Sequence, residues 1–135
     1  MPAPWRTAWI CGASTGIGRE LALMLAARGI DVAISARSGG KLAELAASNA
    51  RLHPYSLDVT DAAATRETAR RIEAAHGPID LAMFNAVVWD PMGASDFDAA
   101  RSARAMDVNF NGVANGLEAV LPGMRARRGG HVVLV

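Results

Sequence analysis

The chain has 135 residues, of which 51% are hydrophobic and 20% are charged, a balance typical of one globular domain with a buried core. Its formal net charge is only +1, so nothing indicates a nucleic-acid partner or an anionic membrane surface. No apolar run approaches the roughly 20 residues of a membrane span, and no secretory signal is recognisable. The one cysteine, Cys11, excludes an intrachain disulfide. We therefore expect a cytoplasmic protein.

Short apolar runs alternate with longer segments rich in Ala and Leu, which is typical of strand–helix–strand units. The expected strands cover residues 5–11, 31–36, 52–57, 79–84 and 131–135. The expected helices cover residues 17–28, 41–47 and 61–76, followed by a helical region from near Ser95 whose longest helix comes after Asp107. This order predicts an α/β protein with a Rossmann-type, doubly wound parallel sheet, in one domain over residues 1–135.

Two of the helices carry apolar residues at helical spacing, and these are expected to face the core. In the first helix they are Ile17, Leu21, Met24 and Leu25. In the helix after Asp107 they are Val113, Leu117, Leu121 and Met124. Pro122 lies within the second pattern, so that helix is expected to kink or stop there.

The chain closes with a continuous Val/Leu run after His131. Such a run predicts a parallel strand covered on both faces. A complete doubly wound sheet continues with further crossover units, so we expect a sheet truncated after its fifth strand. An exposed apolar edge at that strand would be covered by the remainder of the protein or by a partner chain.

A glycine-rich turn follows the first expected strand and opens the first helix. Gly12 allows the tight turn, Gly16 lets the backbone approach a phosphate, and Gly18 permits close packing of helix on strand. Main-chain N–H groups at the helix N-terminus favour an anion, and two hydroxyl groups stand beside them. A dinucleotide site is therefore expected here, and the alternative is an ordinary Gly-rich connection. Its predicted binding residues are Gly12, Ser14, Thr15, Gly16, Ile17 and Gly18.

The spacing Gly-x-x-x-Gly-x-Gly resembles the cofactor turn of the short-chain dehydrogenase/reductase family. Three further segments resemble motifs of that family in the same order: Asp58-Val59, residues 80–87 and residues 108–112. The resemblance implies that Asp58 bonds the adenine amino group and that Val59 packs on the adenine ring. It implies cofactor contacts at Asn85 and Ala86 and a catalytic Asn at Asn109. Phe84 and Val87 depart from the family pattern, which has Asn and Gly there.

The end of the second expected strand selects between NAD and NADP. An acid at this point would accept from the ribose 2′-hydroxyl and repel a 2′-phosphate. The chain has Ala36 there, followed by Arg37, whose guanidinium can pair with a phosphate and stack on adenine. NADP is therefore predicted in preference to NAD, and the alternative is that Arg37 is a solvated surface residue.

The residues for proton transfer are not present in this sequence. In the family a Tyr acts as general acid or base with a Lys four residues later, and a Ser orients the substrate oxygen. The one tyrosine, Tyr55, has Val59 four residues after it, and the one lysine is Lys41. The family's Ser would come a few positions beyond Val135. Asn109 is the one residue here that matches the family's catalytic set. The alternative interpretation is an Asn whose side chain bonds the backbone of its own helix.

Three hypotheses follow for the function. The first is part of an NADP-dependent oxidoreductase that acts on an alcohol or ketone, inactive on its own. The others are a non-catalytic NADP-binding module and an inactive truncated product. The resemblance also implies a homo-oligomer, because the family's dimer interface contains the helix after Asp107.

No metal site is expected, because the three histidines have no metal-ligand spacing: His53, His76 and His131.

Trp89 and Met92 follow the fourth expected strand. We expect them either to line a substrate pocket or to cover the core.

Overall fold

The computed structural model describes residues 4–135, which form one five-stranded parallel sheet in the order β3-β2-β1-β4-β5. The strands are β1 (Thr7–Cys11), β2 (Asp31–Ala36), β3 (Leu52–Ser56), β4 (Leu81–Phe84) and β5 (His131–Leu134). The helices are α1 (Gly16–Ala27), α2 (Gly39–Ala47), α3 (Ala62–His76), α4 (Ala99–Met106), the π-helix η1 (Asp107–Asn111) and α5 (Gly112–Ala126). The predicted Rossmann-type, doubly wound fold is confirmed.

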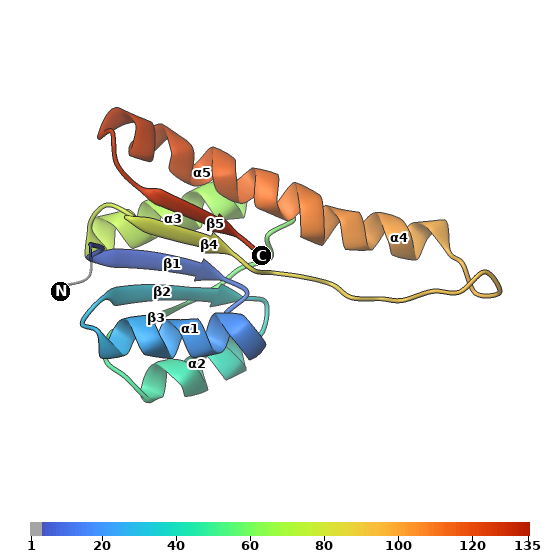
Figure 1. Cartoon of the computed structure of the whole chain (residues 1–135), viewed down its shortest axis with the longest axis horizontal. Coiled ribbons are helices and arrows are strands. Elements are labelled where there is room, and N and C mark those ends of the chain that lie inside the picture. The colour runs from blue at the N-terminus through green and yellow to red at the C-terminus, as the bar shows by residue number, and fades with distance from the viewer. Residues whose placement is uncertain (1–3) are drawn as a thin grey trace.

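Helices cover both faces of the sheet: α1 and α2 lie on one side, and α3 and α5 on the other (Figure 1). Each strand contributes alternate side chains to the two faces. In β1, Ala8 and Ile10 pack under α1 and α2, whereas Trp9 and Cys11 pack under α3 and α5. The sheet is therefore buried on both faces along β1, which explains why all five residues of that strand are buried.

The buried face of α1 differs from the predicted one. Ile17 is 65% exposed and Met24 is 55% exposed, so the expectation that they face the core was wrong. The buried residues of α1 are Gly18, Ala22, Leu25 and Ala26. The helix comes closest to the end of β1 at its first turn, where a Cβ on Gly18 would stand 2.2 Å from the carbonyl oxygen of Gly12.

Helix α5 also approaches the sheet through small residues. Its buried positions are Gly112, Gly116, Val120 and Met124. A Cβ atom built on Gly116 would stand 2.1 Å from Cε1 of Phe84, so the Phe84 ring occupies the space that a side chain would need. On its other side the ring makes an edge-on contact with Trp9. The departure at Phe84 from the family's Asn is thus matched by an absent side chain on α5.

Pro122 does not stop α5, which continues to Ala126. Proline removes one helical N–H donor, and the carbonyl that loses it belongs to Glu118. Both Pro122 and Glu118 are exposed, so water can take the place of the missing donor. Leu121 lies on the same outer side and is exposed, which corrects its predicted place in the core stripe.

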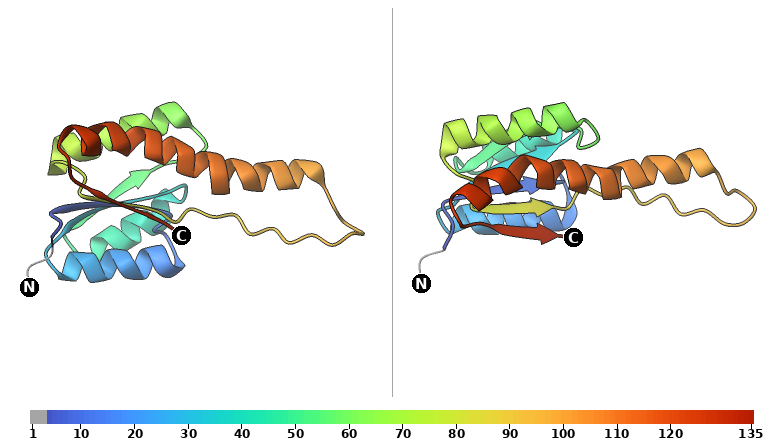
Figure 2. Two further views of the ribbon diagram at one scale, coloured as in Figure 1. Left: turned by 45° about the horizontal axis from the view of Figure 1, so that its top comes forward. Right: turned by 90° about the horizontal axis from the view of Figure 1, so that it is seen from above.

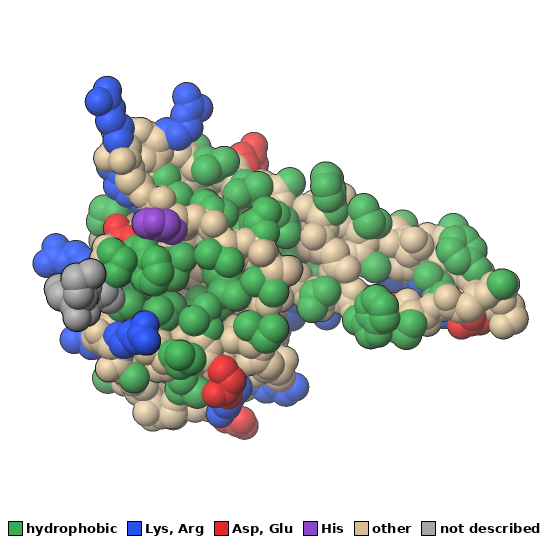
Figure 3. All heavy atoms as spheres, viewed as in Figure 1, with side chains coloured by type: hydrophobic (Ala, Val, Ile, Leu, Met, Phe, Trp, Pro, Cys, Tyr) green, Lys and Arg blue, Asp and Glu red, His purple; other side chains and the backbone are tan. Residues whose placement is uncertain are grey.

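Strand β5 pairs with β4 but is not covered on both faces as predicted. Val133, Leu134 and Val135 are exposed, and only Val132 packs partly against the cluster under α3 and α5. Within residues 4–135 no helix lies over the other face of this strand. Figure 3 shows hydrophobic side chains at the surface in the region of β5.

Helix α4 and the segment before it form an arm that extends beyond the sheet (Figure 2). The helix begins at Ala99 and not near Ser95, because the Asp98 carboxylate accepts from the amides of Ala100 and Arg101 and caps it. The guanidinium of Arg101 pairs with Asp90, which ties the segment to the helix. Trp89 on this segment is 84% exposed, so it does not cover the core.

Two histidines that are far apart in the sequence stack on each other at the amino ends of the strands. The ring centroids of His53 and His76 are 3.9 Å apart. His53 also bonds Asp31, and the Tyr55 hydroxyl bonds Nε2 of His76. Burial lowers the pKa of His76, and the nearby charge of His53 lowers it further, against the opposing effect of Asp31. The pair fits no metal site, and within residues 4–135 no group of three or more His, Cys, Asp or Glu side chains could hold a metal ion.

This lowered pKa predicts how stability depends on pH. The unfolded chain takes up a proton at the ordinary histidine pKa of 6.5, whereas folded His76 resists protonation. The free energy of unfolding should therefore fall as the pH falls from about 7.5 to 5.5, where carboxylates stay ionised. Urea unfolding of the wild type and of His76→Gln measures the effect. The variant should show a flatter dependence on pH, and an equal or steeper one would contradict this assignment.

Candidate functional site

A cleft of about 510 Å³ opens at the carboxyl ends of the strands. It lies where the strand order reverses between β1 and β4, the position at which doubly wound sheets bind ligands. The residues that line it come from the ends of β1, β2, β3 and β4 and from the helical segment after α4. They are Gly12, Ser14, Thr15, Gly16, Ile17, Ser35, Ala36, Arg37, Ser38, Leu57, Asp58, Val59, Asn85, Ala86, Val87, Val88 and Val108.

The glycine turn has no space for side chains at two of its three glycines. A Cβ atom on Gly18 would stand 2.2 Å from the carbonyl oxygen of Gly12, and one on Gly12 would stand 2.6 Å from the amide of Ala86. Gly12 and Gly16 have φ angles of 83° and 59°, which favour glycine. At Gly16 a Cβ would meet no atom within 4 Å, so this glycine leaves an open approach to the backbone.

The amides of the turn divide into two groups. The N–H groups of Gly12 and Ala13 both donate to the carbonyl of Ser35, at 2.7 and 3.2 Å. The N–H groups of Ser14 and Thr15 follow, and those of Gly16, Ile17 and Gly18 form the first turn of α1, where no intrahelical acceptor exists. Thr15 is the N-cap residue, yet its side chain makes no capping bond and the first turn has no acid. This end of α1 is therefore suited to an anion.

Asn85 holds the end of β4 against the glycine turn. Its backbone amide donates to the carbonyl of Cys11 at 2.9 Å, and its side-chain amide donates to the carbonyl of Gly12 at 3.1 Å. These bonds keep the turn folded and leave Ala86 and Val87 on the wall of the cleft. Val87, where the family has Gly, is exposed there.

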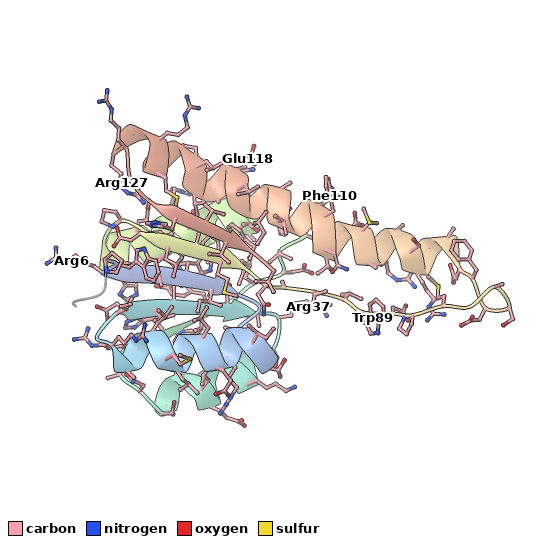
Figure 4. All side chains as sticks on the ribbon, viewed as in Figure 1. Arg6, Arg37, Trp89, Phe110, Glu118 and Arg127 are labelled. Carbon is pink, nitrogen blue, oxygen red and sulfur yellow. The ribbon has the colours of Figure 1, made fainter. Side chains whose placement is uncertain are left out.

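Arg37, Asp58 and Val59 meet at the end of the cleft formed by β2 and β3. Oδ1 of Asp58 accepts from the amide and the hydroxyl of Thr60, at 3.0 and 2.8 Å. These bonds lower the pKa of Asp58, with a smaller contribution from the charge of Arg37. Asp58 is thus a carboxylate at neutral pH. Arg37 is exposed at the end of β2, as Figure 4 shows.

Asn109 lies in η1 and bonds the backbone of Val88 with both ends of its side-chain amide. Oδ1 accepts from the Val88 amide at 2.7 Å, and Nδ2 donates to the Val88 carbonyl at 2.9 Å. The alternative of an Asn bonded to its own helix backbone is therefore wrong. Asn109 does not line the cleft itself, whereas Val88 and Val108 do.

The other polar candidates lie away from the cleft. The Tyr55 hydroxyl bonds His76 on the far side of β3, and Lys41 lies in α2. Burial raises the pKa of the Cys11 thiol to about 12, and its sulfur contacts Oγ of Ser35 at 3.2 Å. Neither Tyr55 nor Cys11 is thus placed to act on a molecule in the cleft.

Ten of the eleven predicted cofactor residues line this one cleft, and the eleventh, Gly18, lies beneath the turn. Sequence reasoning missed several of the lining residues, among them Ser35, Ser38 and Leu57. Their positions at strand ends were a usable signal, since the carboxyl ends of parallel strands meet at one edge. Val88 had no such signal because the segment after β4 has no regular structure.

Comparisons with known proteins agree with this geometry. The family model described as short chain dehydrogenase matches residues 6–135. An uncharacterized oxidoreductase of Myxococcus xanthus is 41% identical over 133 residues, which are 96% of this chain and 53% of that protein.

Solved structures are similar as well. A short-chain dehydrogenase from Streptomyces avermitilis superposes with a TM-score of 0.90 and 30% identity over 99% of this chain and 50% of that one. LigO from Sphingobium gives the same TM-score and identity over 96% of this chain and 50% of that one. The chain thus spans about half the length of these relatives. No helix within residues 4–135 has the length and apolar character to cross a bilayer. The chain belongs to the short-chain dehydrogenase/reductase family of oxidoreductases.

Proposed function

We propose that residues 1–135 are the cofactor-binding part of an NADP-dependent oxidoreductase that transfers hydride between a nicotinamide and an alcohol or ketone. The observation that carries the proposal is the single cleft that brings the glycine turn together with Arg37 and Asp58. The glycine turn fits a dinucleotide. The diphosphate would accept hydrogen bonds from the open amides between Ser14 and Gly18, because no side chain caps the N-terminus of α1.

The preference for NADP follows from the charges at the far end of the cleft. Ala36 offers no acceptor to a ribose 2′-hydroxyl, and the Arg37 guanidinium would pair with a 2′-phosphate. Asp58 uses Oδ1 for Thr60, so Oδ2 would accept from the adenine amino group. Val59 would pack on the adenine ring.

The nicotinamide, when bound, supplies or accepts the hydride. The chain's own residues would bind the dinucleotide, and Asn109 would position the Val88 segment beside it through its two bonds. We propose that the Ser, Tyr and Lys of the family come from outside residues 1–135, because Tyr55 and Lys41 lie away from the cleft. On this proposal residues 1–135 alone bind NADP without turnover. We also propose a cytoplasmic location, a reducing compartment in which the one free cysteine, buried Cys11, would stay a thiol.

Calorimetry with NADP⁺ and NAD⁺ tests the cofactor preference. The wild type should bind NADP⁺ at least tenfold more tightly, as expected for a charge-assisted hydrogen bond to phosphate. Arg37→Ala should remove about that factor for NADP⁺ and leave NAD⁺ binding within about twofold. Arg66→Ala is the control, because it removes the same charge from an exposed ion pair with Glu118 on α3 and α5.

Equal loss of both coenzymes in Arg37→Ala would contradict the role of this arginine. No uptake of either coenzyme by the wild type would contradict the proposed function as a whole. Binding of NADP⁺ by a protein that also contains the family's Ser and Tyr-x-x-x-Lys, without turnover of any alcohol or ketone, would favour the non-catalytic binding module.

We also propose that the protein self-associates through the outer side of α4, η1 and α5. Met106, Phe110 and Leu121 are exposed there, and exposed apolar groups of this kind are typical of an interface. In sedimentation experiments Phe110→Arg should convert dimers to monomers. Met24→Arg, a control at a similarly exposed apolar residue on α1, should not. A monomeric wild type, or equal behaviour of the two variants, would contradict this interface.

A further inference from the structure

The polar side chain of Asn115 on α5 bonds a residue 56 positions earlier in the chain. Its Nδ2 donates to the carbonyl oxygen of Val59 at 2.8 Å, and both residues are largely removed from solvent. Val59 stands in the connection between β3 and α3, outside any helix or strand. The contact therefore joins the Arg37–Asp58 end of the cleft to α5, on the face of the sheet opposite α1 (Figure 1).

The connection that contains Val59 is fixed at both of its ends. The amide of Leu57 donates to the carbonyl of Ala36, and the amide of Asp61 donates to the carbonyl of Asp58. Asp61 then caps α3 through the amide of Ala64. Between these points, the one bond described for the Val59 carbonyl is that from Asn115. Loss of this donor would leave the carbonyl of a residue that is only 8% exposed without a partner.

Helix α5 also sets the position of the Val59 side chain. A Cβ atom on Gly112 would stand 2.6 Å from Cγ2 of Val59, so the isopropyl group rests directly on the helix backbone. Asn115 follows Gly112 by three residues, and residues three apart share a helix face. The two residues hold Val59 together: one bonds its carbonyl, and the other limits its side chain.

We propose that Asn115 is a positioning residue of the adenine subsite, which holds Val59 at the height where its side chain meets the adenine ring. This inference rests on the proposed function, since it assumes that adenine lies over Val59. It assigns a role in coenzyme affinity to a residue that does not line the cleft. Asn115 thus resembles Asn109, whose side-chain amide also donates to a backbone carbonyl on the cleft wall, that of Val88.

Binding of 2′,5′-ADP, the adenine half of NADP, tests the inference without any turnover. The variants are Asn115→Leu, which has similar size and no donor, and Asn115→Asp, which replaces the donor by an acceptor. We expect the dissociation constant to rise about three- to tenfold in each, as for the loss of one positioning hydrogen bond. Nuclear Overhauser effects between the adenine protons and the Val59 methyl groups should weaken in parallel.

Asn111→Leu is the matched control, because Asn111 is exposed on the preceding turn and bonds only Asp107 of its own helix. Its affinity for 2′,5′-ADP should stay within about twofold of the wild type. Thermal unfolding of every variant is measured alongside.

The inference is wrong if both Asn115 variants fold and bind 2′,5′-ADP like the wild type. It is equally wrong if both fail to fold, because the side chain would then serve the fold alone. It is also wrong if the Overhauser effects to Val59 persist while affinity falls, because Val59 would then keep its place on the adenine ring without Asn115. Failure of the wild type to bind 2′,5′-ADP or NADP⁺ would instead contradict the proposed function, so the two failures are distinguishable.

Discussion

The close approach of α1 to the end of β1 is the constraint on which the site depends. A helix can begin directly over the Gly12 carbonyl only because residue 18 has no side chain, since its Cβ would stand 2.2 Å from that oxygen. The same approach turns the open N–H groups of the first helical turn toward the cleft, and Asn85 closes the arrangement from β4. It also explains why Ile17, one position before Gly18, points outward to line the cleft.

A second helix supports the cleft from the opposite face of the sheet. The segment η1–α5 carries Asn109 and Asn115, which bond the connections after β4 and β3. Gly112 and Gly116 let this helix rest directly on Val59 and Phe84. The walls of the cleft are thus held by two helices on different faces of the sheet. The contacts that α1 makes with Gly12 and those that η1–α5 makes with Val59, Phe84 and Val88 all leave the open amides of the glycine turn free. A π-turn at η1 is consistent with this use, because such turns occur often at functional sites.

Features that depend on local pattern could be predicted from the sequence. All five strands and the glycine turn were recognised, since alternation and glycine spacing are properties of neighbouring residues. The errors concern contacts between distant segments. Met24 was expected in the core because its spacing fits a helix stripe, but the buried stripe of α1 runs through Gly18, Ala22, Leu25 and Ala26, which leaves Met24 on the outer side. The stack of His53 on His76 and the bond from Asn115 to Val59 join segments more than 20 residues apart, and no local pattern indicates either of them.

The central claim is that the amides from Ser14 to Gly18 receive the diphosphate of a nicotinamide dinucleotide. Titration of the ¹⁵N-labelled protein with NADP⁺, followed by the amide resonances, tests it most directly. The account predicts the largest shifts at Ser14 to Gly18, with little change at Gly12 and Ala13, whose amides already bond Ser35. Saturable binding that leaves the resonances of Ser14 to Gly18 unmoved would contradict it.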